Sequence, residues 1–297
     1  MAFALDHVIL AVADLDAATR DWAHLLGRAP SWRGSHPALG SANTLFRFGG
    51  SYLELLAAAP DREGLLGAMV RDLLDGREER PFGLALGVDD VDRAVARLRG
   101  FGVETLDPAD GEGRETSSGV RRTWRSALVV PDTVRGLRML VIRHTSAPDL
   151  LSIASPSVPD GASVVGALDH VVVFSEDLDA SLRLWSEAFE LDEAWAKDFP
   201  ERKTRNRGLR FERLDSSDPE GASDIVLELI QRTDREARGR PDVLWGTAFR
   251  VADCARAAAR IREKAIPVDD PRPGLMAGTT VATVRWPRTP VLLLSSD

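Results

Sequence analysis

The stretch LDHVILAVADLDAATRDW, residues 5–22, returns without a gap as LDHVVVFSEDLDASLRLW, residues 168–185. Both copies begin with apolar residues around a histidine, continue into an Asp-rich turn and end with apolar positions at helical spacing. Weaker copies begin at Phe82 (FGLALGVDDVDRAVARLRG) and at Trp245 (WGTAFRVADCARAAARIRE). The repeats indicate that the chain contains four related units, grouped as two similar halves.

Each unit predicts one strand, one helix and three further strands. The aspartate of the turn is expected to accept hydrogen bonds from free backbone N–H groups and to begin the helix. In the first unit, TLFRFGG (44–50) and SYLELLA (51–57) predict a hairpin across a Gly-rich turn. The third unit has a longer polar loop, DSSDPEGAS (215–223), between the matching strands. We therefore expect an α+β protein built from four βαβββ units.

Length and composition limit the classes of function. A chain of 297 residues is long enough for about two domains. The net charge of −8 argues against nucleic acid and anionic membrane surfaces as partners, since both require a concentrated positive face. The sequence contains no run of about 18 apolar residues and does not begin with a basic, then apolar leader. We expect a cytoplasmic monomer or homodimer that binds a small molecule.

The limits of the domains follow from the repeats. A stretch rich in Ser, Pro, Ala and Asp separates the two halves and predicts a linker. The expected limits are 1–145 for the first domain (units 1–58 and 80–145), 146–164 for the linker, and 165–297 for the second domain (units 165–232 and 243–297).

A unit that opens with DHVILAVADLDAA and closes with YLEL resembles the vicinal oxygen chelate superfamily, which includes glyoxalase I, extradiol dioxygenases and bleomycin-resistance proteins. The first half is similar to the glyoxalase-like domain group through GSHPALGSANTLFRFGGSYLELLA (34–57) and GRETSSGVRRTWRSAL (113–128). The resemblance implies two tandem half-barrel domains, each made of two paired βαβββ units. It also implies that metal ligands come from the first and last strands that line each cup.

The residues expected to bind metal are a histidine and a glutamate in each half. His7 lies on the first strand of unit one and Glu54 on its last strand; His170 and Glu228 are their counterparts in unit three. Strand alternation places Glu54 on the same face as Tyr52. A carboxylate in such an apolar strand is costly unless it is paired, hydrogen-bonded or metal-bound. Glu54 is therefore the predicted catalytic group and a predicted metal ligand.

The partner units depart from the pattern of the superfamily. The aligned first-strand positions are Gly83 and Gly246, and the closing strands of both partner units lack a carboxylate. His36 would complete a two-histidine, one-carboxylate set for zinc, nickel, manganese or iron in the first half. Phe199 or Pro200 stands at that position in the second half, so no third ligand is evident there. The sequence thus favours the first half as the working site.

Further polar and aromatic residues are expected to contact a ligand. Asn43 and Asn206 recur in register, which suggests a shared contact in the two halves. Glu54 has an alternative pairing with Arg47 or Arg125, and His144, at a strand end, is expected to be solvated. The resemblance implies that three of the candidates, from unit two, lie in or near the first cup. The predicted substrate-binding residues are Asn43, Tyr52, Arg114, Trp124 and Arg125.

Two classes of function remain open at this level. One is a metal-assisted lyase, isomerase or dioxygenase acting on a small molecule with adjacent oxygens. The other is a metal-free module that sequesters a drug-like compound, as the bleomycin-resistance branch does. An alternative pairing of unit one with unit three would bring the histidine and glutamate of both halves onto one ion, although short connections favour sequential pairing.

Overall fold

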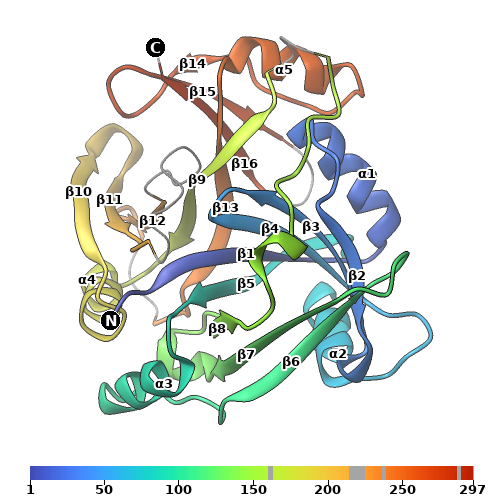
Figure 1. Cartoon of the computed structure of the whole chain (residues 1–297). Coiled ribbons are helices and arrows are strands. Elements are labelled where there is room, and N and C mark those ends of the chain that lie inside the picture. The colour runs from blue at the N-terminus through green and yellow to red at the C-terminus, as the bar shows by residue number, and fades with distance from the viewer. Residues whose placement is uncertain (160–162, 214–224, 236–238, 286–288, 297) are drawn as a thin grey trace.

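Each of the four units folds as a strand, a helix and three strands (Figure 1). The computed structural model describes residues 1–159, 163–213, 225–235, 239–285 and 289–296. The polar loop expected at 215–223 lies outside the described residues, as do residues 160–162 of the expected linker. No helix within the described ranges is long and apolar enough to cross a bilayer.

The elements follow the expected order, with one additional helix, α2, between the first two units. The first half contains β1 (Ala4–Val12), α1 (Leu15–Leu26), β2 (Trp32–His36), β3 (Ser41–Phe48), β4 (Ser51–Ala58), α2 (Leu65–Leu74), β5 (Glu79–Gly87), α3 (Val91–Gly100), β6 (Ala109–Glu115), β7 (Arg121–Val129) and β8 (Met139–His144). The second half contains β9 (Val165–Phe174), α4 (Leu178–Arg183), β10 (Asp192–Phe199), β11 (Thr204–Arg210), β12 (Val226–Arg232), β13 (Val243–Val251), α5 (Cys254–Arg262), β14 (Arg272–Pro273), β15 (Thr279–Val284) and β16 (Val291–Ser296). Short 3-10 turns cover Pro37–Leu39, Pro131–Val134, Pro148–Leu150 and Pro200–Arg202, and a π-helical turn, Leu184–Ala188, extends α4.

An aspartate caps the repeated helix of every unit, as the sequence predicts. The side chains of Asp14, Asp90 and Asp177 each accept a hydrogen bond from the backbone N–H three residues later. Asp253 accepts hydrogen bonds from the backbone N–H groups of Ala255 and Arg256 at the start of α5. Each bond satisfies a donor that the first helical turn leaves free, so the acidic turn both ends the strand and begins the helix.

The first half closes into a barrel of eight strands. Its strand order is β1-β4-β3-β2-β6-β7-β8-β5, and β1 pairs with β5 antiparallel to complete the ring. The seam between β2 and β6 is short, pairing Gly34 with Glu115 and Ser35 with Arg114. A Cβ on Gly34 would lie 2.5 Å from the carbonyl oxygen of Arg114, so only glycine permits this close approach. The first half is therefore more closed than the half-open cup that the resemblance implies.

The second half forms an open sheet of eight strands, β10-β11-β12-β9-β13-β16-β15-β14. Lys197 of β10 occupies the position that Gly34 holds in β2, and its amine donates to the carbonyl oxygen of Leu275. A side chain at this position prevents the backbone approach that closes the first half. The equivalent edges therefore stay apart.

Helix α2 covers one end of the barrel. Its Val70 and Leu74 pack in a separate apolar cluster with Ile9, Leu56 and Phe82, which line the barrel interior. Residues 59–79 are expected only to connect the first two units, and α2 lies within them. Helix α2 therefore fills part of this end of the barrel, beside a small pocket that Ile9, Phe82 and Leu128 line.

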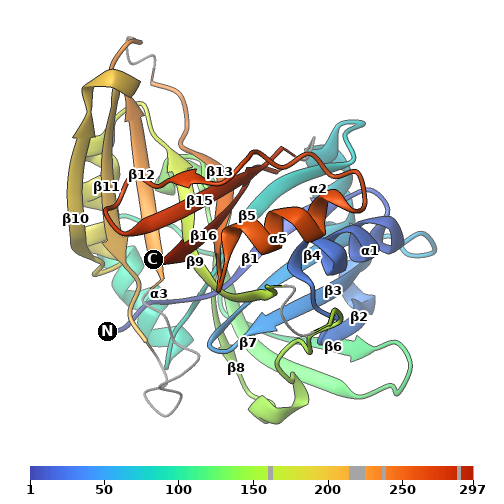
Figure 2. The ribbon, with the colours of Figure 1, turned by 90° about the horizontal axis from the view of Figure 1, so that it is seen from above.

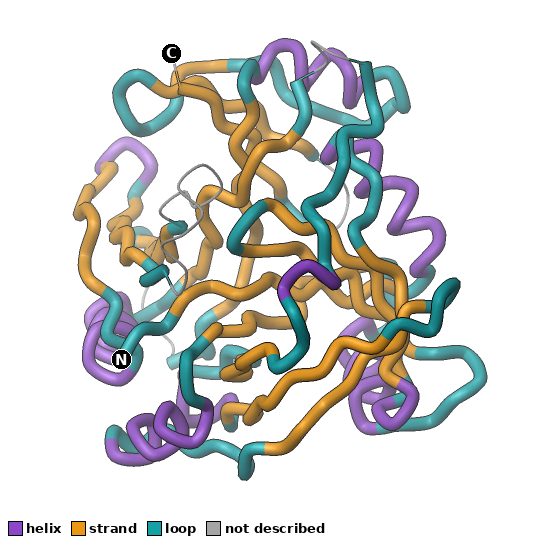
Figure 3. Tube along the Cα trace, in the orientation of Figure 1, coloured by secondary structure: helices purple, strands orange, loops and turns teal. Residues whose placement is uncertain are grey.

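The two halves pack closely together, with the helices at the periphery of the sheets (Figure 3). The C-terminal end of α1 lies beside α5 in Figures 1 and 2, and the Arg260 guanidinium donates to the carbonyl of Leu25 at 2.9 Å. The first unit pairs with the second, through β1 and β5, and the third with the fourth, through β9 and β13. The alternative pairing of units one and three is not formed, so His7 and His170 belong to different sheets.

Candidate functional site

A histidine–glutamate pair lies inside the first barrel. Strands β1 and β4 run parallel, with His7 opposite Tyr52 and Ile9 opposite Glu54. This register places His7 Nε2 3.2 Å from Glu54 Oε2. The exposed fractions of His7 and Glu54 are 4% and 7%, so the pair is shielded from water. Glu54 pairs with this histidine rather than with Arg47 or Arg125, the alternatives raised by the sequence.

Two further side chains fix the pair. His7 Nδ1 lies 2.6 Å from Asp6 Oδ2, and the Asn43 amide donates to Glu54 Oε1 at 2.7 Å. Burial alone would lower the pKa of His7, but hydrogen bonds to Asp6 and Glu54 outweigh it and raise that pKa to about 9. Burial would raise the pKa of Glu54, yet His7 outweighs it and the net shift is downward. The two side chains are therefore an ion pair at neutral pH.

The second half repeats this arrangement. His170 Nδ1 lies 2.7 Å from Asp169 Oδ2, and His170 Nε2 lies 3.5 Å from Glu228 Oε2. Asn206 donates to Glu228 Oε1 at 2.7 Å, the distance seen for Asn43 and Glu54. The recurrence of asparagine in register thus reflects a shared contact with glutamate. The sequence analysis did not single out the two aspartates, although each directly precedes its histidine in the repeated motif.

The predicted metal set does not converge. His36 Nδ1 lies 2.9 Å from Ser41 Oγ, and its Nε2 faces the Asn43 amide at 3.4 Å. Among the described residues, no three of His, Cys, Asp and Glu are placed to hold one ion. Two donors rarely retain a catalytic metal, which needs at least three protein ligands and an open position. The donor types suit a divalent metal, but their positions do not fit one.

An aromatic ring also covers the pair. Tyr52 stacks on His7, with ring centroids 4.3 Å apart and planes inclined by 19°. Tyr52, but neither His7 nor Glu54, lines the cavity at the end of the barrel opposite α2. A ligand in that cavity therefore meets Tyr52 before it meets the ion pair.

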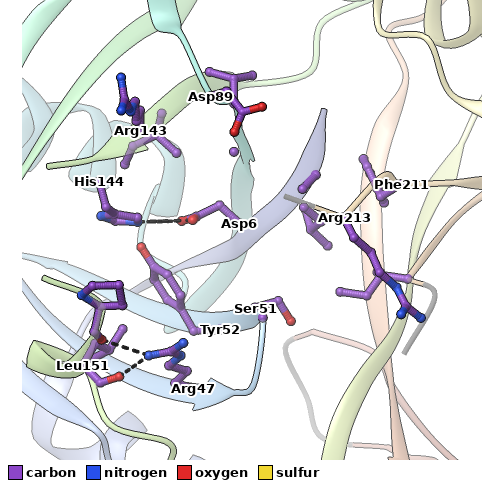
Figure 4. A pocket seen from close by; sticks show the side chains of 18 of the residues that line it. Asp6, Arg47, Ser51, Tyr52, Asp89, Arg143, His144, Leu151, Phe211 and Arg213 are labelled. Atoms are coloured by element: carbon purple, nitrogen blue, oxygen red, sulfur yellow. Dashed lines mark hydrogen bonds and ion pairs between the residues drawn. The ribbon is translucent and has the colours of Figure 1, made fainter. Parts of the chain in front are cut away.

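This cavity has a volume of about 350 Å³ and lies between the first barrel and the second half. Asp6, Tyr52 and His144 point toward one another on one side, and Phe211 and Arg213 lie on the other (Figure 4). His144 Nε2 lies 3.2 Å from both carboxylate oxygens of Asp6. The side chain of His144 is 26% exposed, so it is partly solvated as expected, but its Nδ1 is buried.

The arginines predicted to bind ligand point away from the cup. Arg125 forms an ion pair with Asp92 of α3 at 2.9 Å, and Arg114 hydrogen-bonds Glu112. Trp124 faces inward and meets His36 edge to face, with ring centroids 5.6 Å apart. Arg122, two residues before Trp124 in β7, shares its face and lines the cavity. Strict alternation along RRTWRSA indicates this arginine, which the sequence analysis missed.

Comparisons with known proteins agree with this architecture. The family model described as glyoxalase-like domain matches residues 5–164, and that of the glyoxalase/bleomycin resistance protein/dioxygenase superfamily matches residues 167–290. A comparison with curated protein sequences found no match.

Solved structures show the same fold at low sequence identity. A variant of 4-hydroxymandelate synthase from Streptomyces coelicolor has a TM-score of 0.66 and 16% identity, covering 100% of this chain and 94% of that one. The Mn(II)-bound glyoxalase from Novosphingobium aromaticivorans has a TM-score of 0.63 and 16% identity, covering 98% and 81%. A hypothetical protein from Staphylococcus aureus has a TM-score of 0.62 and 14% identity, covering 98% of both chains. These similarities concern the fold alone.

Proposed function

Since the chain belongs to the glyoxalase-like domain family, within the vicinal oxygen chelate superfamily, we propose that it binds a small organic molecule in the first barrel without a metal ion. The observation that carries this proposal is that His7 and Glu54 engage each other instead of an ion. Their facing atoms contact each other, and Asp6 and Asn43 hold the outer atoms. The ring nitrogens of His7 and the carboxylate oxygens of Glu54 are all engaged inside the protein, so the pair forms a rigid polar floor for a binding cavity, although Asn43 Oδ1 is buried without a partner among the described residues.

The protein's own residues then divide into two layers. The buried layer holds the charge of His7 and Glu54 in fixed positions and keeps water out. The layer above it, Tyr52 and His144, meets the ligand in the cavity. A cavity of about 350 Å³ matches the lower end of the volume range for small-molecule sites.

A metal-assisted lyase, isomerase or dioxygenase is the second candidate, and one observation favours it. The same histidine, glutamate and asparagine recur in both halves, with an Asn–Glu distance of 2.7 Å in each and His–Glu distances of 3.2 and 3.5 Å, which a purely structural ion pair does not require. His7 and Glu54 would be the first ligands of such an ion, and the predicted role of Glu54 as a catalytic group would depend on it.

Elemental analysis separates these candidates. Protein purified without an affinity tag would be measured as isolated, and again after incubation with Mn²⁺, Fe²⁺, Ni²⁺ or Zn²⁺ and gel filtration. We expect less than stoichiometric metal in every case, and unchanged metal content in His7→Ala. The matched control is His170→Ala in the second half. Stoichiometric metal that disappears in His7→Ala would overturn the proposal and favour the second candidate.

A further inference from the structure

The cavity contains a buried cation without a partner. Arg122 is 8% exposed, and within the described part of the chain its guanidinium makes no hydrogen bond or ion pair. Its Cζ lies 5.6 Å from the ring centroid of Trp32 and 5.9 Å from that of Tyr52. Aromatic faces attract a cation, but they leave the N–H donors of the guanidinium unsatisfied. A buried, unpaired charge is strongly unfavourable unless something else completes it.

His144 lines the same cavity as Arg122. His144 Nδ1 is buried and, among the described residues, has no hydrogen-bond partner, while Nε2 of the same ring is held by Asp6. The His144 and Tyr52 ring centroids are 6.4 Å apart, so His144 and Arg122 both lie beside Tyr52. Both side chains therefore flank the same aromatic ring of the cavity wall.

The other charged residues of the cavity are already engaged or exposed. Arg47 donates to the carbonyl oxygens of Gly49 and Pro148, at 2.7 and 3.1 Å, and so shapes the wall. Asp89, Arg143 and Glu212 are exposed at the rim, and Arg213 has partners of its own. Arg122 is thus the buried cation that a ligand would meet deepest in the cavity.

We infer that the cavity binds a small organic monocarboxylate, whose carboxylate is held by the Arg122 guanidinium. The inference rests on the proposed binding function and names its ligand class. A planar carboxylate matches the guanidinium fork with two parallel hydrogen bonds. The apolar body of the ligand would lie against the remaining lining, to which both halves contribute: Phe48, Ile142, Leu151, Phe211 and Ile225.

Calorimetric titration of the full-length protein tests this inference with defined probes: benzoate, phenylacetate, the corresponding amides and inorganic phosphate. We expect at least one carboxylate to bind at least ~10-fold more tightly than its amide, because the amide leaves Arg122 without a charged partner. Arg122→Met should abolish this preference, and Arg122→Lys should weaken binding because lysine lacks the planar fork. Arg121→Met, on the outer face of the same strand, is the matched control and should bind normally.

Thermal unfolding supplies a readout that separates lost binding from lost folding. Because Arg122→Met removes a buried unpaired charge, its melting temperature without ligand should equal or exceed that of the wild type. Carboxylate binding that survives Arg122→Met, equal binding of carboxylate and amide, tighter binding of phosphate, or no binding of any carboxylate overturns the inference. Elemental analysis tests the metal-free function separately, since equal binding of the amides would leave that function intact.

Discussion

At the scale of single residues, the central feature is a histidine between two carboxylates. Asp6 and Glu54 contact the two ring nitrogens of His7, at 2.6 and 3.2 Å, in a site shielded from water. Burial disfavours the charged form of all three side chains. The pKa of His7 is nevertheless raised and those of Asp6 and Glu54 are lowered, because the contacts among the three outweigh the effect of burial. The cluster is therefore stable as a unit and sensitive to removal of one member.

Removal of Glu54 provides the first test. Glu54→Ala leaves a protonated His7 and the Asn43 amide without their acceptor, and should lower the free energy of unfolding by about 3 kcal/mol. Urea denaturation followed by circular dichroism measures this loss.

Glu228→Ala in the second half is the matched control for Glu54→Ala. Its effect should be smaller, because the His170–Glu228 distance is 3.5 Å and the His170 side chain is 14% exposed. Equal losses in the two variants would contradict the view that the first half holds the tighter pair.

The pH dependence of stability follows from the raised pKa of His7. Its folded-state pKa is about 9, against 6.5 ordinarily, so protonated His7 stabilises the fold fully below pH 6.5 and loses this effect as pH rises through 9. The carboxyls of Asp6 and Glu54 have lowered pKa values, so their contribution is lost instead at acidic pH.

Urea midpoints of the wild type and of His7→Gln, compared from pH 6 upward, measure the contribution of His7. The stability advantage of the wild type should shrink between pH 6.5 and 9 and be absent above it. An advantage that stays constant across this range would show that His7 does not carry the charge.

At the scale of elements, local patterns predict much of the structure. Alternation along SYLELLA correctly places Tyr52 and Glu54 on one face, and the repeated aspartates begin their helices as expected. The same alternation applied to β7 would have distinguished inward Arg122 from outward Arg125. Closure of the barrel was not predictable in this way, because the seam between β2 and β6 joins residues about 80 positions apart, and local periodicity carries no information on such contacts.

The seam depends on Gly34. In Gly34→Ala the added Cβ would lie 2.5 Å from the Arg114 carbonyl oxygen and 2.3 Å from Trp32 Nε1. We expect the free energy of unfolding to fall by about 2 kcal/mol, as in other overpacked sites.

Gly50→Ala, where nothing lies within 4 Å of the added atom, is the matched control for Gly34→Ala. It should change stability by less than ~0.5 kcal/mol. If both variants were equally stable in urea, the close approach of the strands would not be what requires glycine at position 34.

At the scale of the whole molecule, the two halves share one apolar core. The cluster contains residues from both sheets and from α1 and α5. The cavity uses the same junction, with Tyr52 from the barrel on one side and Phe211 from the second half on the other (Figure 4). The repeated motif predicts two similar halves, but the contacts between them arise from side chains outside the motif. The site is consequently a property of the pair of halves.

Phe249 tests whether the halves behave as one folding unit. Its ring, on β13, contacts Trp22 of α1 edge to face at 6.3 Å and Phe48 of β3 at 5.7 Å. Phe249→Ala should cost about 4 kcal/mol, the range for a fully buried phenylalanine. Met276→Ala, at an exposed position, is the control and should change stability by less than ~0.5 kcal/mol.

The shape of the unfolding transition shows whether the two halves form one folding unit or two. Tryptophan fluorescence reports on both halves, because Trp22 and Trp185 are buried in the first and second half respectively. If the shared core couples the halves, fluorescence and circular dichroism should give coincident single transitions in urea for the wild type, shifted together in Phe249→Ala. Two separated transitions, with only the second-half transition moved by Phe249→Ala, would mean that each half is stable by itself. The cavity would then lie between two independently folding bodies, and ligand binding would link them by stabilising their contact.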